Sequence, residues 1–169
     1  VSTVVMLGPV HERRADGLFL TESDYFQTPV GDVRVDLDLC EELETCGTSF
    51  VSNDIPHLAE HSLEILLPFV RRCFPDASIV PILIAGERSS SVSALARGLD
   101  LVFGSNLDST LFVISSNLCD HLGAKRARGL EAERSMCEAD GQAAPGIVAF
   151  IDIDPRKIGR RRRGLPILD

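Results

Sequence analysis

The sequence lacks any run of about 18 apolar residues, the length that a membrane-spanning helix needs. It also lacks a basic segment followed by an apolar one, which is the pattern of a secretory leader. These absences predict a soluble, cytoplasmic protein with no membrane partner. Because the first residue is Val1 and not Met, we expect the sequence to be a fragment or a processed product that lacks an N-terminal segment.

No C-x-x-C pair occurs among the five cysteines, and their odd number leaves at least one unpaired in any intrachain disulfide scheme. Reduced thiols are therefore expected, as in most cytosolic proteins. Neither G-x-G-x-x-G nor G-x-x-x-x-G-K is present, so no nucleotide-binding loop is predicted. Ser115 and Ser116 lie outside any G-x-S-x-G element, which disfavours a serine hydrolase.

Basic residues are concentrated at the C-terminal end. The net charge is −8, but Arg156, Lys157 and residues 160–163 contribute six positive charges, which leaves −14 on the rest of the chain. An acidic body argues against nucleic acid as a partner. With 169 residues and 44% hydrophobic content, the sequence predicts one domain over residues 1–155, followed by a basic tail over residues 156–169.

Short apolar runs alternate with helical patterns along the chain. The apolar runs at residues 4–7, 79–85 and 111–114 are typical of buried strands. The helical patterns cover residues 36–45, 57–73 and 88–103, with a charged helix expected over 125–139 and a last strand over 147–153. This alternation predicts an α/β fold with a mixed or mostly parallel central sheet flanked by helices.

Polar residues follow the first and third of these predicted strands. His11 comes after Gly8-Pro9, and residues 115–121 come after the run at 111–114. Because ligands of α/β sheets gather at the carboxyl ends of the strands, a cleft is expected there. Its predicted lining is His11, His61, Glu64, Asn117, Asp120 and His121.

The segment from Asp54 to Phe69 has the densest polar chemistry in the chain. His57, His61 and Glu64 are spaced i, i+4 and i+7, so a helix capped by Asp54 would place all three on one face. Pro68 has no N–H, so the helix is expected to kink or end near the polar face.

Several interpretations of these residues remain open. His57-Leu-Ala-Glu-His61 matches H-x-x-E-H, the signature of an inverted zinc protease. Alternatively, His61 and Glu64 only hydrogen-bond to loops and support the cleft wall. Cys119 is interpreted as a structural cysteine more readily than as a thiol activated by His121.

The order and spacing of several elements across residues 2–121 resemble the Memo family. They are Leu7-Gly-Pro-Val-His11, Thr28-Pro-Val-Gly-Asp-Val-Arg-Val-Asp36, Glu60-His-Ser-Leu-Glu-Ile-Leu-Leu-Pro-Phe69, Ile79-Val-Pro-Ile-Leu-Ile84 and Val113-Ile-Ser-Ser116. This resemblance implies a fold like that of class III extradiol dioxygenases, whose iron is held by two histidines and a carboxylate. Memo-like pockets have two histidines and a cysteine. Proposed roles in the family include metal or redox chemistry, recognition of phosphotyrosine peptides and work beside a radical-SAM protein.

The family pattern carries over to this chain only in part. His11 matches one pocket histidine, whereas the family's other one lies upstream of Val1, and neither Cys119 nor Cys137 can be assigned as the cysteine. The family's Ser-Ser-Asp-x-x-His is Ser115-Ser-Asn-Leu-Cys-Asp120 here.

We therefore expect a non-catalytic or impaired member that binds a metal, a small ligand or a peptide. The alternative is a metal-dependent oxidoreductase in which His11, His61 and Asp120 hold iron, copper or zinc. A zinc protease is the third hypothesis.

Overall fold

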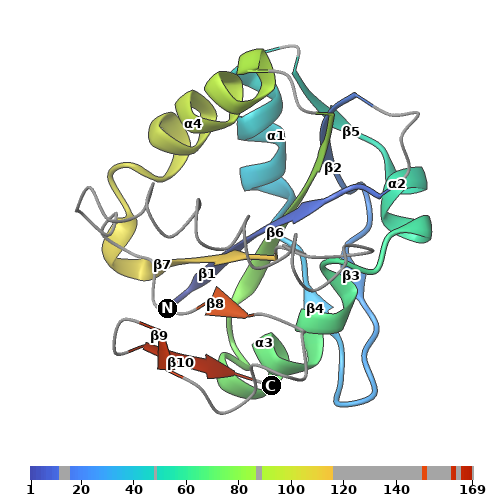
Figure 1. Cartoon of the computed structure of the whole chain (residues 1–169), viewed down its shortest axis with the longest axis vertical. Coiled ribbons are helices and arrows are strands. Elements are labelled where there is room, and N and C mark those ends of the chain that lie inside the picture. The colour runs from blue at the N-terminus through green and yellow to red at the C-terminus, as the bar shows by residue number, and fades with distance from the viewer. Residues whose placement is uncertain are drawn as a thin grey trace, which may run out of the picture. The chain divides into compact units, whose positions relative to one another are not determined.

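The computed structural model describes residues 1–11, 16–47, 49–86 and 89–115, together with three short strands nearer the C-terminus. The chain divides into two compact units, Val1–Ser115 and Ser116–Asp169. The first unit contains the main sheet and all the described helices (Figure 1).

The main sheet has five strands in the order β5-β2-β6-β1-β7. The buried strand β1 (Thr3–Pro9) pairs in parallel with β6 (Ser78–Ala85) and with β7 (Thr110–Ile114). Strand β2 (Gly17–Leu20) runs antiparallel to β6 but parallel to β5 (Phe50–Ser52). The predicted α/β fold with a mixed, mostly parallel sheet is therefore confirmed.

Two smaller sheets accompany the main one. Strands β3 (Tyr25–Phe26) and β4 (Val33–Arg34) form an antiparallel pair. In the second unit, β10 (Leu165–Leu168) pairs with β8 (Phe150–Ile151) and with β9 (Arg161–Arg162).

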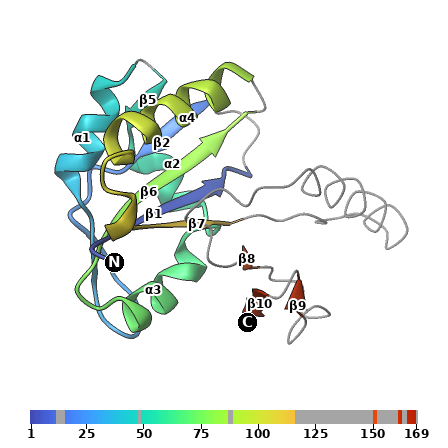
Figure 2. The ribbon, with the colours of Figure 1, turned by 90° about the vertical axis from the view of Figure 1, so that its left-hand side faces the viewer.

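Helices α1 (Leu37–Thr45) and α4 (Ser89–Phe103) form where the apolar periodicity predicts them. The Asp36 side chain caps α1 by accepting a hydrogen bond from the Leu39 N–H. Both helices lie on one side of β1 and β7, and α3 (Leu67–Cys73) lies on the other (Figures 1 and 2). The core between these layers is apolar, and its fully buried members include Val4, Met6, Leu18, Leu43, Ile79 and Phe103.

The prediction of one continuous helix over residues 57–73 is wrong. The segment forms α2 (Asp54–Ala59), an extended residue at Glu60, the 3₁₀ turn η1 (Glu64–Leu66) and then α3. Asn53, not Asp54, caps α2 through its side chain. Pro68 lies in the first turn of α3, where a missing N–H costs nothing, so it begins a helix instead of kinking one.

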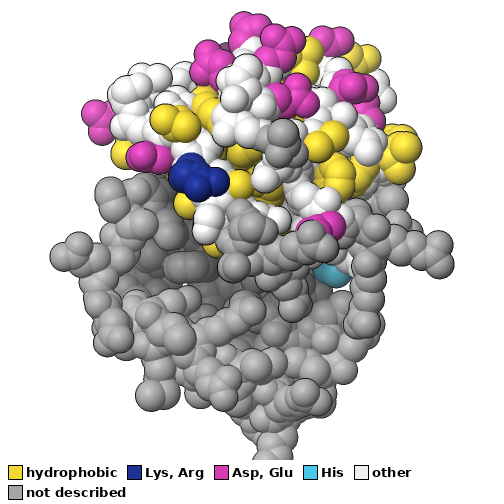
Figure 3. Space-filling model, turned by 90° about the horizontal axis from the view of Figure 1, so that it is seen from above, with side chains coloured by type: hydrophobic (Ala, Val, Ile, Leu, Met, Phe, Trp, Pro, Cys, Tyr) yellow, Lys and Arg dark blue, Asp and Glu magenta, His cyan; other side chains and the backbone are white. Residues whose placement is uncertain are grey.

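The surface of the first unit is acidic, in keeping with the charge balance of the sequence. Acidic side chains are widespread and basic ones rare on the face seen in Figure 3. Within the described residues, no helix combines the length and the apolar character that a membrane crossing requires.

Candidate functional site

The buried carboxylate of Glu60 is the centre of the site. Only 8% of the residue is exposed, and it accepts hydrogen bonds from three backbone N–H groups. The donors are His11 at 2.7 Å, His61 at 2.8 Å and Ser62 at 2.9 Å. The His61 and Ser62 N–H groups are free to donate because the chain leaves the helix at Glu60, so the end of α2 is coupled to the burial of this carboxylate.

The imidazole of His11 is fixed by the same carboxylate. Its Nδ1 lies 3.0 Å from both oxygens of Glu60. Burial alone would raise the pKa of Glu60, but the backbone and ring donors of His11 and the Ser62 N–H lower the pKa below its ordinary value. An ionised carboxylate only accepts hydrogen bonds, so Nδ1 carries the proton and, in the neutral ring, Nε2 keeps its lone pair.

His61 lies against His11 on the same carboxylate. Its Nδ1 is 3.5 Å from Glu60 Oε1, and the two rings stack with centroids 5.5 Å apart and planes 14° from parallel. The His61 side chain is 72% exposed, compared with 40% for His11. One buried carboxylate thus holds two solvent-accessible imidazoles.

The absence of a side chain at Gly8 lets the Gly-Pro-x-His element that contains His11 contact the Glu-His-Ser element that begins at Glu60. A Cβ at this position would lie 2.6 Å from Leu63 Cδ2 and 2.7 Å from Ser62 Oγ, both closer than real atoms approach. The Ser62 hydroxyl donates to the Pro9 carbonyl at 2.9 Å. The Gly-Pro-x-His and Glu-His-Ser elements therefore dock directly, although they are about 50 residues apart in the chain.

The carboxyl end of β7 lies beside that of β1, as the alternation of strands predicts. The Ser115 N–H donates to the Leu7 carbonyl at 2.7 Å. The predicted cleft residues Asn117, Asp120 and His121 follow Ser115 directly, and they lie outside the described residues, as do Cys119 and Cys137.

The prediction that one helical face carries His57, His61 and Glu64 is wrong, because α2 ends at Ala59 and no continuous helix joins the three. The His57 Nε2 lies 3.2 Å from the Phe19 carbonyl, and its ring packs 6.0 Å from Phe26. Burial lowers the pKa of His57 below its ordinary value. The helix required by H-x-x-E-H ends before Glu60, so the zinc-protease arrangement is not formed.

Glu64 lines a separate cavity of about 310 Å³ next to the site. His57, Glu60 and Leu63 also line this cavity, whereas His11 and His61 are not among the described residues that line it. The structure therefore brings His11 and His61 together and places Glu64 in the neighbouring pocket.

Two imidazoles match part of a transition-metal site. Iron, copper and zinc accept imidazole nitrogen, but the described residues contain no group of three His, Cys, Asp or Glu side chains placed to hold a metal ion. Cys40, Cys46 and Cys73 are free cysteines. Burial, followed by the charges of Asp36 and Glu44, raises the pKa of Cys40 to about 12, so its thiol remains protonated and is no ligand.

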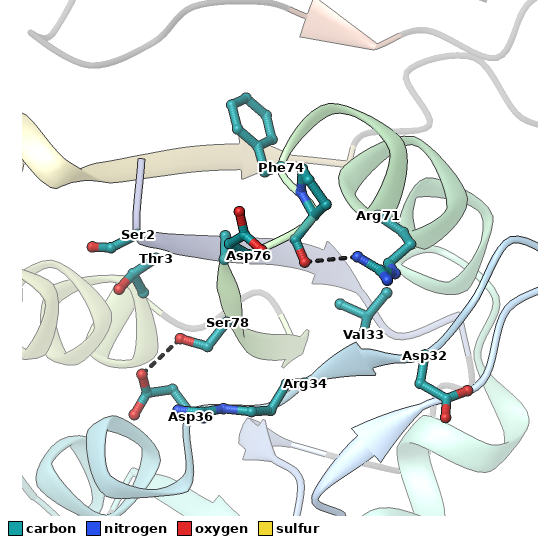
Figure 4. Close-up of a pocket in the computed structure, with 12 residues that line it drawn as sticks. Ser2, Thr3, Asp32, Val33, Arg34, Asp36, Arg71, Phe74, Asp76 and Ser78 are labelled. Carbon is teal, nitrogen blue, oxygen red and sulfur yellow. Dashed lines mark hydrogen bonds between the residues drawn. The ribbon is translucent and has the colours of Figure 1, made fainter.

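A second cavity, of about 500 Å³, opens at the amino ends of β1 and β6 (Figure 4). The Arg71 Nη1 donates to the Pro75 carbonyl at 2.6 Å, and its buried Nε has no hydrogen-bond partner among the described residues. Arg34 and Asp76 line the same cavity, and Ser78 Oγ donates to Asp36 at 2.7 Å. Groups of both signs meet here, so the lining does not decide the charge of a ligand.

Comparison with known proteins decides the family. The model of the Memo-like protein family matches residues 1–143. This chain belongs to the Memo-like protein family. A MEMO1 family protein of Schizosaccharomyces pombe is 32% identical over 132 residues, which cover 74% of this chain and 42% of the relative.

Archaeal relatives show the same coverage. A MEMO1 family protein of Metallosphaera sedula is 27% identical over 70% of this chain, and one of Methanobrevibacter smithii is 29% identical over 72%. This Memo-like chain spans 42% and 43% of the length of those two proteins. It therefore spans about two-fifths of the curated relatives that it matches.

The sequence pattern did not single out Glu60 as a cleft residue. The H-x-x-E-H pattern gave it the role of the water-activating glutamate in a zinc-protease motif, which needs a continuous helix there. The available signal was its place at the start of the Glu-His-Ser element, directly before an imidazole.

Proposed function

We propose that this Memo-like chain is a non-catalytic binding protein whose His11 and His61 bind a divalent transition metal. The observation that carries this proposal is the contact of His11 Nδ1 with both oxygens of Glu60. Histidines that bind metals usually donate their second N–H to a carboxylate, which fixes the tautomer and raises the basicity of the free nitrogen.

The exposure of the two rings favours binding of a further molecule beside the metal. With two imidazoles as ligands, iron, copper or zinc retains open coordination positions. A small ligand or a peptide carboxylate is the expected occupant of those positions. The ion supplies the attraction for such a group, while Glu60 orients the His11 ring and the His61 ring stacks on it.

Calorimetric titration with zinc tests this proposal. His11→Ala and His61→Ala are each expected to weaken binding by about tenfold or more, because each removes one of the two ligands. His57→Gln is the matched control, since its amide can still donate to the Phe19 carbonyl outside the site. Equal affinity of the parent and both alanine variants would reject the imidazole site.

The oxidoreductase alternative requires a carboxylate beside the two imidazoles, and Asp120 is the candidate. The pairing of His11 and His61 on one carboxylate favours it, because a two-histidine, one-carboxylate set binds ferrous iron. Incubation of the iron-loaded protein with catechols in air separates the two hypotheses. Ring cleavage that disappears in Asp120→Asn would replace the non-catalytic proposal with the oxidoreductase.

A further inference from the structure

The charged side chains that line the cavity of about 310 Å³ beside the histidine pair are all acidic. Asp54, Glu60 and Glu64 contribute carboxylates, and the described residues assigned to its walls include no Lys or Arg. Burial of Asp54 opposes ionisation, yet the hydrogen bonds that its carboxylate accepts lower its pKa below the ordinary value. The cavity therefore carries negative charge at neutral pH.

The neutral polar groups of the lining add acceptors to this charge. The hydroxyl protons of Thr21 and Ser23 are both directed to the Asp54 carboxylate, so their oxygens retain only lone pairs for a ligand. A carbonyl oxygen cannot donate, so His57 carries its proton on Nε2, toward Phe19, and its Nδ1 is an acceptor. These acceptors favour an occupant that donates hydrogen bonds.

Gln27 and several apolar and aromatic side chains form the rest of the wall. Phe26, Leu63 and Leu83 line the cavity, as do Tyr25 and Leu58, which are 51% and 86% exposed. The face of an aromatic ring attracts cations, and the leucines suit an alkyl stem. The volume lies at the lower end of the usual range for ligand pockets, about 300–1,000 Å³, so it suits one side chain or a short amine.

We infer that this cavity binds a primary ammonium or guanidinium group on an alkyl stem. The group comes either from a free alkylamine or from a lysine or arginine side chain of a peptide. The donors of the cation satisfy the acceptors of the lining, its charge offsets the carboxylates, and its stem packs on the leucines. The cavity shares the Glu60 side chain with the histidine pair, but it is expected to bind the cation whether or not a metal is present.

Titration followed by NMR chemical shifts tests the charge of the ligand. Agmatine and 1,5-diaminopentane are expected to saturate the signals of Tyr25, Leu58 and Glu64, whereas pentanol and pentanoate are not. Equal affinity for agmatine and pentanoate would overturn the inference, because the lining would then not select for positive charge.

A pair of variants tests the location. Glu64→Gln is expected to weaken agmatine binding about tenfold, since it removes one charged acceptor from the wall. Glu22→Gln is the control, because this exposed residue changes the net charge equally but is not assigned to the wall of the cavity. Equal effects of the two substitutions would show that only the overall charge acts and would overturn the site.

A third comparison identifies the source of the cation. A blocked tripeptide with a central arginine is compared with the same peptide containing neutral citrulline. Selective binding of the arginine peptide assigns the cavity to peptide side chains, and binding of agmatine alone assigns it to free amines. Failure of every cation to bind would reject the inference, whereas the zinc titration would still test the histidine pair.

Discussion

At the scale of single residues, the site depends on how one carboxylate is satisfied. Glu60 is buried, and three N–H groups and an imidazole compensate for the loss of water around it. The sequence predicted that His11 and His61 would meet, because both come from motifs at the expected cleft. It did not predict Glu60 as the link between them. In a continuous helix the His61 and Ser62 N–H groups would donate to backbone carbonyls and could not bond to the Glu60 carboxylate.

Glu60→Gln tests this link. The amide keeps the size of the side chain but loses its charge and can donate, so the tautomer of His11 is no longer fixed. We expect zinc affinity to fall about 10–100-fold, as for other residues that orient metal ligands. Nitrogen chemical shifts of the His11 ring should report a change in the tautomer. An unchanged tautomer together with unchanged affinity would contradict the role assigned to Glu60.

At the scale of elements, periodicity predicted those that are long or buried on both faces. Strands β1 and β6 and helices α1 and α4 belong to this class, and β7 was predicted from its apolar run alone. The short strands β2 and β5 were missed, because runs of four and three residues carry little periodic signal. The interruption at Glu60 was also missed. It depends on the contact of Glu60 with the distant His11, and no Gly or Pro directly before Glu60 signals the end of a helix.

The cap of α2 allows a test at this scale. Asn53 accepts the Ile55 N–H at 3.0 Å, so Asn53→Ala is expected to lower the free energy of unfolding by about 1 kcal/mol. Asn106→Ala is the matched control, since Asn106 precedes η2 (Leu107–Ser109) without a side-chain capping bond. Urea denaturation measures both variants. Equal losses would show that the Asn53 side chain does not stabilise α2.

At the scale of the whole molecule, several shifted pKa values act in the same direction. Burial lowers the pKa of His57 below its ordinary 6.5. Below that pH the unfolded chain binds a proton at His57 before the folded chain does, so stability falls as the pH falls. Burial opposes ionisation of Asp54 and Glu60, but their hydrogen bonds lower the pKa values below the ordinary 3.8 and 4.5. Their contribution is present above those values and is lost as the pH falls through the folded-state pKa.

We therefore expect stability to decline in two stages on acidification. The first stage begins below about pH 6.5 and is due to His57, and the second begins below about pH 4.5 and is due to the carboxylates. Urea midpoints measured from pH 8 to pH 3 would show both stages. His57→Gln should remove the first stage and leave the second, and a first stage that persists in this variant would assign it to another group.

The position of β1 between β6 and β7 has a consequence for synthesis of the chain. Its partners are β6 and β7, and Ser2 next to it bonds to Ser109, 107 positions later. While a ribosome extends the chain, this strongly apolar strand must wait for both neighbours, and closing such long loops is slow. In the nascent chain β1 therefore stays exposed until both neighbours have been made, and a chaperone is expected to protect it during that interval.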